Sequence, residues 1–96
     1  MHSALFVAQV FGIEPKRWGD FLVQAKVRSQ TYPNVSRLAE NVWLVNLLEN
    51  PAPLAYFVVA ATELGVPYGI LPFEREPEWL PVGFDPKTIR GHSEET

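Results

Sequence analysis

The sequence predicts a small α+β domain in which two helices cover one face of a four-stranded sheet. Three observations lead to this prediction: a continuous apolar run at residues 4–11, a segment with two apolar faces at residues 42–48, and a proline inside the last predicted strand. Apolar character on both faces is typical of central strands, whereas proline is confined to edges because it lacks an amide hydrogen. The sheet therefore has the first and third strands in its middle and the fourth at an edge.

The N-terminal part predicts one strand and one helix. Residues 4–11 are rich in branched and aromatic side chains and end at Gly12, as strands often do. Pro15 suits the first turn of a helix, and Pro33 ends that helix between Arg28 and Tyr32. The apolar stripe of this helix, which faces the sheet, consists of Trp18, Phe21, Leu22 and Ala25.

Two short strands at residues 35–38 and 42–48 predict an antiparallel hairpin. The connection is Ala39-Glu40-Asn41, and asparagine tolerates the positive φ that tight hairpin turns require. In the second strand, alternate side chains point to opposite faces. One face carries Trp43, Val45 and Leu47, and the other carries Val42, Leu44, Asn46 and Leu48. We expect Trp18 and Trp43 to lie in the core, because each is in register with an apolar stripe.

The second helix is predicted between Pro51 and Leu64. Asn50 is its N-cap, and Gly65 closes it in the left-handed conformation. Residues 68–73 then form a strand that Pro72 places at an edge. The order strand, helix, strand, strand, helix, strand is the split βαβ pattern, so the predicted fold is a ferredoxin-like α+β sandwich.

The chain continues beyond this fold. Residues 74–78 are a charged spacer, residues 79–84 are apolar, and residues 85–96 form a polar tail. We therefore expect one domain at 1–84, with a tail at 85–96 that is disordered. The apolar extension either packs on its own domain, adds a fifth strand, or contacts another chain, since exposed apolar patches mark interfaces. Its candidate interface residues are Trp79, Leu80, Val82 and Phe84.

Composition narrows the classes of function. The apolar fraction of 47% excludes a disordered chain, and no apolar run is long enough to span a membrane. With no signal peptide visible, we expect a soluble, cytoplasmic protein. The absence of cysteine excludes disulfides and thiolate zinc sites, and stability that depends on packing alone favours a homodimer.

No catalytic, cofactor or metal site is predicted. The glycines form no phosphate-binding loop, and the serines lack the setting of a catalytic nucleophile. His2 and His92 lie near the termini, where a histidine base is hard to position. Glu74, Glu76 and Glu78 alternate, but Arg75 and Pro77 between them favour a solvated spacer over a cation site.

The hairpin Arg37-Leu38-Ala39-Glu40-Asn41-Val42-Trp43-Leu44-Val45, the apolar first strand and the C-terminal extension resemble the Cas2 and SinR-like group of small ferredoxin-like proteins over residues 4–84. The resemblance implies a homodimer in which residues 79–84 join the partner's sheet as a fifth strand. The group also places a metal-binding aspartate just after the first strand. Here Val10-Phe11-Gly12 stands there, so we do not expect nuclease activity.

Two classes of function remain, together with a third alternative. The net charge of −3 favours a non-catalytic protein that binds a protein partner, such as an inhibitor, an immunity protein or a regulatory subunit. The alternative is a Cas2-like dimer associated with nucleic acid, whose phosphates would contact a group of cations. Those cations are Lys16, Arg17, Lys26, Arg28 and Arg37. The third is an enzyme with a pocket formed on dimerisation, because this fold hosts many chemistries.

Overall fold

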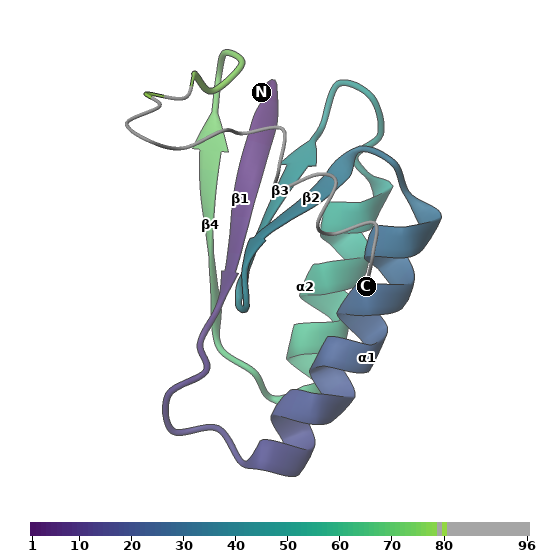
Figure 1. The fold of residues 1–96 in the computed structure, drawn as a ribbon, viewed down its shortest axis with the longest axis vertical. Helices are drawn as coiled ribbons and strands as arrows, with labels where there is room; N and C mark the ends of the chain where they lie inside the picture. Colours follow the sequence, from purple (N-terminus) through teal and green to yellow (C-terminus); the bar gives the residue numbers. More distant parts are fainter. Residues whose placement is uncertain (79, 81–96) are drawn as a thin grey trace.

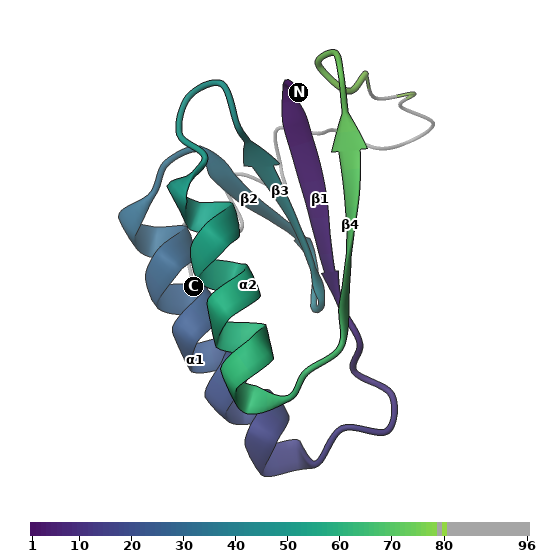
Figure 2. The ribbon, with the colours of Figure 1, turned by 180° about the vertical axis from the view of Figure 1, so that it is seen from behind.

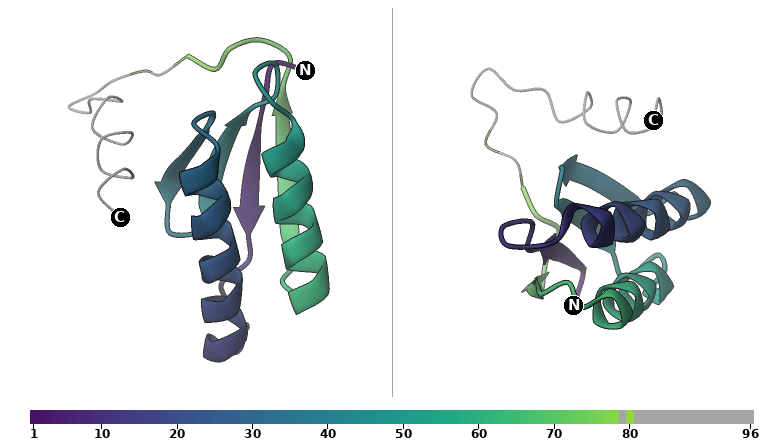
Figure 3. Two further views of the ribbon diagram at one scale, coloured as in Figure 1. Left: turned by 90° about the vertical axis from the view of Figure 1, so that its right-hand side faces the viewer. Right: turned by 90° about the horizontal axis from the view of Figure 1, so that it is seen from below.

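The computed structural model describes residues 1–78 and 80 of the chain, and it has the predicted order of elements. These elements are β1 (Ser3–Ala8), α1 (Pro15–Thr31), β2 (Val35–Ala39), β3 (Val42–Asn46), α2 (Ala52–Leu64) and β4 (Tyr68–Phe73). The sheet has the order β2-β3-β1-β4 and every neighbouring pair is antiparallel (Figure 1). Both helices lie on one side of it, as Figures 2 and 3 show. The predicted ferredoxin-like α+β fold is confirmed, with β4 and its proline at an edge.

Two strands are shorter than predicted, and the hydrogen bonding explains where each ends. β1 stops at Ala8 instead of residue 11, because Ala8 is paired with Tyr68, the first residue of β4, and no strand continues beside it. β3 stops at Asn46 instead of residue 48. The Asn46 Oδ1 accepts hydrogen bonds from the backbone amides of Leu48 and Glu49, which turns the chain away from the sheet.

The prediction that Asn41 adopts a positive φ is wrong. Among the described residues, only glycines have positive φ. The pairing of β2 with β3 shifts register between Arg37 and Ala39, as at a β-bulge. Asn41 connects the hairpin to the end of β1. Its Nδ2 donates to the Ala8 carbonyl at 2.9 Å, and its own carbonyl accepts from the Ala8 amide at 2.9 Å.

Helix α2 begins one residue later than predicted, at Ala52, and its N-cap is Pro51 instead of Asn50. Asn50 still contributes to this end, because its Oδ1 accepts a hydrogen bond from the Ala52 amide at 3.0 Å. At the other end, Gly65 has a φ of 67°, and the Val66 amide donates to the Ala61 carbonyl at 2.8 Å. The left-handed glycine therefore satisfies the last turn and directs the chain toward β4.

The core lies between the helices and the inner face of the sheet and is built around Phe6. This side chain is fully buried, and its ring centroid lies 5.2–6.2 Å from the centroids of four other rings. Those rings belong to Phe21, Trp43, Phe57 and Tyr68. Trp18 is also buried, so both tryptophans lie in the core as predicted. The Trp18 Nε1 has no hydrogen-bond partner within the described residues.

Asn34 is a buried polar residue that joins three elements. Its Nδ2 donates to the Asn46 carbonyl at 2.8 Å and to the Asn50 carbonyl at 2.7 Å. Its own carbonyl accepts from the Asn46 amide at 3.0 Å. Both amide hydrogens are thus used, and the start of β2 is held against the end of β3 and the start of α2.

Candidate functional site

The face of the sheet opposite the helices carries a continuous set of apolar side chains, which we call the outer face. In β1, Ala4, Phe6 and Ala8 are fully buried on the helix side, so the alternate positions point outward. The strand register places the corresponding positions of β3 and β4 on the same face. The contiguous apolar set consists of Leu5, Val7, Val42, Leu44 and Leu71, and Phe73 lies on the same face at the end of β4, opposite Ser3.

These side chains form two rows across the sheet. Leu5 is directly opposite Leu44 on one side and Leu71 on the other. Val7 is opposite Val42 in the next row. Such cross-strand neighbours lie about 5 Å apart, so the five side chains make one contiguous patch. Leu71 keeps 55% of its surface exposed and Val7 keeps 36%, although neither is near a loop tip.

Polar groups border this patch at the end of the sheet where β1 begins. A hollow of about 240 Å³ lies there. It is lined by the polar residues Ser3, Ser36 and Asn46, by Leu44 of the patch, and by Glu76 and Pro77. The chain that follows β4 therefore passes this end of the outer face. Within the patch, Leu5, Val42 and Leu44 are half-buried, whereas Val7 and Leu71 are exposed.

The two edges of the sheet are poorly suited to pairing with another strand. Pro72 in β4 lacks the amide hydrogen that a new ladder would use, and the bulge between Arg37 and Ala39 distorts β2. Both features are common ways in which proteins protect edge strands. A further strand would therefore pair poorly at either edge of the sheet.

The strands of the outer face carry no charge, although Glu49 and Glu76 line the hollow that borders the patch. The outward-facing positions of the four described strands carry serine, asparagine, glycine, alanine and apolar residues, without an ionisable side chain. Arg37 belongs to the opposite side, where its Cζ lies 5.5 Å from the centroid of the Trp43 ring. Its Nη2 donates to the Glu40 carbonyl at 2.7 Å. This arginine supports the hairpin turn from the helix side.

The five predicted phosphate contacts do not gather in one place. Arg17 and Arg28 share one side of α1, but they are separated by eleven residues, or about 16 Å. The Arg17 Nη1 lies beside Gly65, whereas the Arg28 guanidinium stacks on Tyr56. Lys16 and Lys26 fall on other sides of the helix, because successive residues are about 100° apart. Together with Arg37 on β2, these residues give a dispersed set of cations.

Most of the predicted interface lies outside the described residues. Leu80 is described and is 90% exposed, whereas Trp79, Val82 and Phe84 are not described. The candidate fifth strand, the tail at 85–96 and the domain boundary at residue 84 lie there as well. Their role therefore stays a prediction.

One serine and one histidine come together at the start of β1. The His2 Nδ1 lies 2.6 Å from the Ser3 Oγ. Ser3 is only 2% exposed, so its hydroxyl is not open to a substrate. Among the described residues, no group of three histidine, cysteine, aspartate or glutamate side chains could hold a metal ion.

Within the described part of the chain, no helix combines the length and the apolar character needed to cross a membrane.

Comparisons with family models, curated proteins and solved structures found no match to this chain. The resemblance to the Cas2 and SinR-like group thus stays a hypothesis.

Proposed function

We propose that this chain is a non-catalytic binding protein that recognises a protein partner through the outer face of its sheet. The observation that carries this proposal is the apolar patch formed by Leu5, Val7, Val42, Leu44 and Leu71 on three adjacent strands. Contiguous apolar surface that is open to solvent is uncommon on monomers and usually marks an interaction site.

The chemistry of the patch favours protein over nucleic acid. Sheets that bind single-stranded RNA present aromatic rings for base stacking and cations for phosphates. The outward positions of β1 and β3 here carry Leu5, Val7, Val42 and Leu44 instead. Phe73, at the end of β4, is the single outward aromatic residue of the described strands, and these strands place no cation beside the patch. An apolar face of this kind fits the nonpolar side chains at the centre of a protein interface.

The patch also favours binding over catalysis. General acid–base chemistry needs a titratable side chain within hydrogen-bond reach of the substrate. The outward positions of the described strands offer no such group. His2, Glu49 and Glu76 line the hollow beside the patch, but the Ser3 hydroxyl there is buried. The proposed action is therefore to occupy a surface of the partner, as inhibitors and regulatory subunits do.

Capture of partners with matched variants tests this function. We expect the tagged full-length chain to retain a protein from a lysate of its source organism after washing at high salt. Leu71→Asp, which puts a charge on the patch, should reduce that capture at least ten-fold, because a buried unpaired charge is strongly unfavourable. Thr62→Asp, at an exposed position of α2 in the helix layer, should leave capture unchanged.

Three results would contradict the proposal. The first is equal capture by wild type and Leu71→Asp. The second is capture of nucleic acid that is lost at high salt, which would support the alternative Cas2-like function. The third is failure of the wild-type chain to retain any protein. Thermal unfolding of each variant should accompany the assay, so that loss of capture is separated from loss of fold.

A further inference from the structure

Helix α2 is apolar on every side, although it lies at the surface of the molecule. Glu63 is the only charged residue among its thirteen, Ala52–Leu64. Phe57 and Ala61 are buried against the sheet, but Val59 on the outward side is 51% exposed and Tyr56 is 39% exposed. A helix that is apolar all round is normally covered on more than one side. The sheet covers only the side of α2 that carries Phe57 and Ala61.

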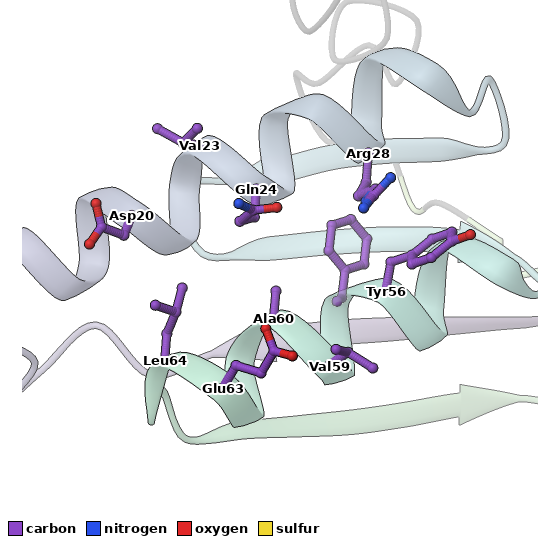
Figure 4. A pocket seen from close by; sticks show the side chains of 10 residues that line it. Asp20, Val23, Gln24, Arg28, Tyr56, Val59, Ala60, Glu63 and Leu64 are labelled. Carbon is purple, nitrogen blue, oxygen red and sulfur yellow. The ribbon is translucent and has the colours of Figure 1, made fainter.

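The neighbouring helix extends the same surface. Val23 of α1 is 61% exposed and lines a groove of about 410 Å³ together with Val59 and Tyr56 of α2 (Figure 4). Val27, one turn further along α1, is 47% exposed and continues the apolar surface. Gln24 and Ala60 also line the groove, so both helices contribute to it. We call this surface the α1–α2 face.

The two ends of the groove carry opposite charges. Asp20 and Glu63 lie at one end, and Arg28 lies at the other (Figure 4). The Cζ of Arg28 is 4.2 Å from the centroid of the Tyr56 ring, which fixes the guanidinium at its end. The pKa of Tyr32, whose ring stacks on that of Tyr56, is raised mainly by a hydrogen bond with the Tyr56 side chain and secondly by burial. The Tyr32 phenol therefore stays neutral at physiological pH. None of the three charged side chains has an ion-pair partner within 4.0 Å among the described residues.

This layout is complementary to itself. Asp20 and Arg28 are eight residues, or about 12 Å, apart along α1. A two-fold axis that runs across the helices would lay α1 on the partner's α1 in the opposite direction. Each Arg28 would then meet the acidic end of the other copy, and the apolar centres would meet each other. A two-fold axis along the helices would instead bring like charges together at both ends.

We propose that a second copy of this chain docks on the α1–α2 face through the two-fold axis that runs across the helices. The charges select this arrangement, and the apolar character of α2 explains why the face is covered. Two adjacent helices give a face of roughly 25 by 20 Å. That area is at the small end for a stable interface, so the dimer is weak, with a Kd in the micromolar range.

Charge reversal in the full-length chain tests this proposal. We expect sedimentation equilibrium of the wild type to show a monomer–dimer equilibrium. At low ionic strength, Arg28→Glu should raise the Kd at least ten-fold, because it changes attraction into repulsion at both ends. Asp20→Arg combined with Glu63→Arg should do the same. When these two variants are mixed, they should form a heterodimer at least as tight as the wild-type dimer.

The heterodimer is the decisive result, because two misfolded variants would not restore association. In addition, Val59→Asp should weaken the wild-type dimer at any ionic strength. The proposal is overturned if the wild type stays monomeric at millimolar concentration, or if the mixture fails to associate. It is also overturned if dimerisation is unaffected by the reversals but is lost in Trp79→Ala with Phe84→Ala or in Leu71→Asp. Those results would place the second copy on the C-terminal extension or on the outer face.

Discussion

Replacing Phe6 with alanine is expected to lower the free energy of unfolding by about 3–5 kcal/mol. Phe6 is fully buried, and it contacts aromatic rings from α1, β3, α2 and β4. Removing it leaves a cavity that borders every layer of the core. Domains of this size are stable by only about 5–15 kcal/mol, so the variant should be close to unfolding at room temperature.

Phe11→Ala is the matched control, because it removes the same side chain from a position that is 89% exposed. Its effect should stay within about 0.5 kcal/mol. Urea unfolding followed by circular dichroism measures both values. A loss below about 1 kcal/mol for Phe6→Ala, or equal losses for the two variants, would contradict the placement of Phe6 at the centre of the core.

The second large effect is expected for Asn34→Asp. The substitution keeps the size of the side chain but removes the two hydrogens that reach the carbonyls of Asn46 and Asn50 at 2.8 and 2.7 Å. At neutral pH a carboxylate would face two carbonyl oxygens at a site that is 7% exposed. We expect a loss of about 3–5 kcal/mol, which is typical for an uncompensated buried charge.

This variant should also respond to pH in a defined direction. Burial and the two carbonyls would raise the pKa of the introduced carboxyl above the value of about 3.9 that it has in the unfolded chain. The folded state then binds the proton more tightly, so the penalty is largest above the folded-state pKa and shrinks as the pH falls through it. Unfolding of Asn34→Asp and wild type at pH 7 and pH 4 measures the difference. A constant difference between the two proteins would contradict the proposed hydrogen bonds.

Much of the fold could be predicted because local residue chemistry marks its boundaries. Pro15 opens α1, Gly65 closes α2, and Pro72 restricts β4 to an edge of the sheet. Each of these residues limits the backbone by its own covalent structure and needs no tertiary contact to do so. The positive φ expected at Asn41 failed for the opposite reason. The register shift within this hairpin depends on how β2 pairs with β3.

The outer face could not be predicted from the sequence. A strand has the same hydropathy pattern whether its second face packs against its own domain or against a partner. In β1 the inward residues Phe6 and Ala8 alternate with the outward residues Leu5 and Val7, and all four are apolar. Such a run predicts a central strand, but it does not say whether the second face meets the protein itself or a partner. The arrangement of the helices on one side supplies that information.

The five cations predicted to contact phosphates are close together in the sequence, but this does not make them close in space. Lys26 and Arg28 are two residues apart, yet the helical rotation puts them on nearly opposite sides of α1. Arg28 instead lines the groove with residues of α2 that are far away in the sequence. Projecting the predicted helix at about 100° per residue is sufficient to separate Lys26 from Arg28, so this part of the error was avoidable from the sequence.

Photocrosslinking from the outer face tests the proposed function most directly. A photoreactive phenylalanine analogue replaces Leu71 in the full-length chain, and the same analogue at Thr62 serves as the control. In a lysate of the source organism, we predict that position 71 crosslinks to another protein, that nuclease treatment leaves the product intact, and that position 62 does not form it. Crosslinks from position 71 that reach only nucleic acid, or only residues of its own chain, would contradict a protein-binding role for this face.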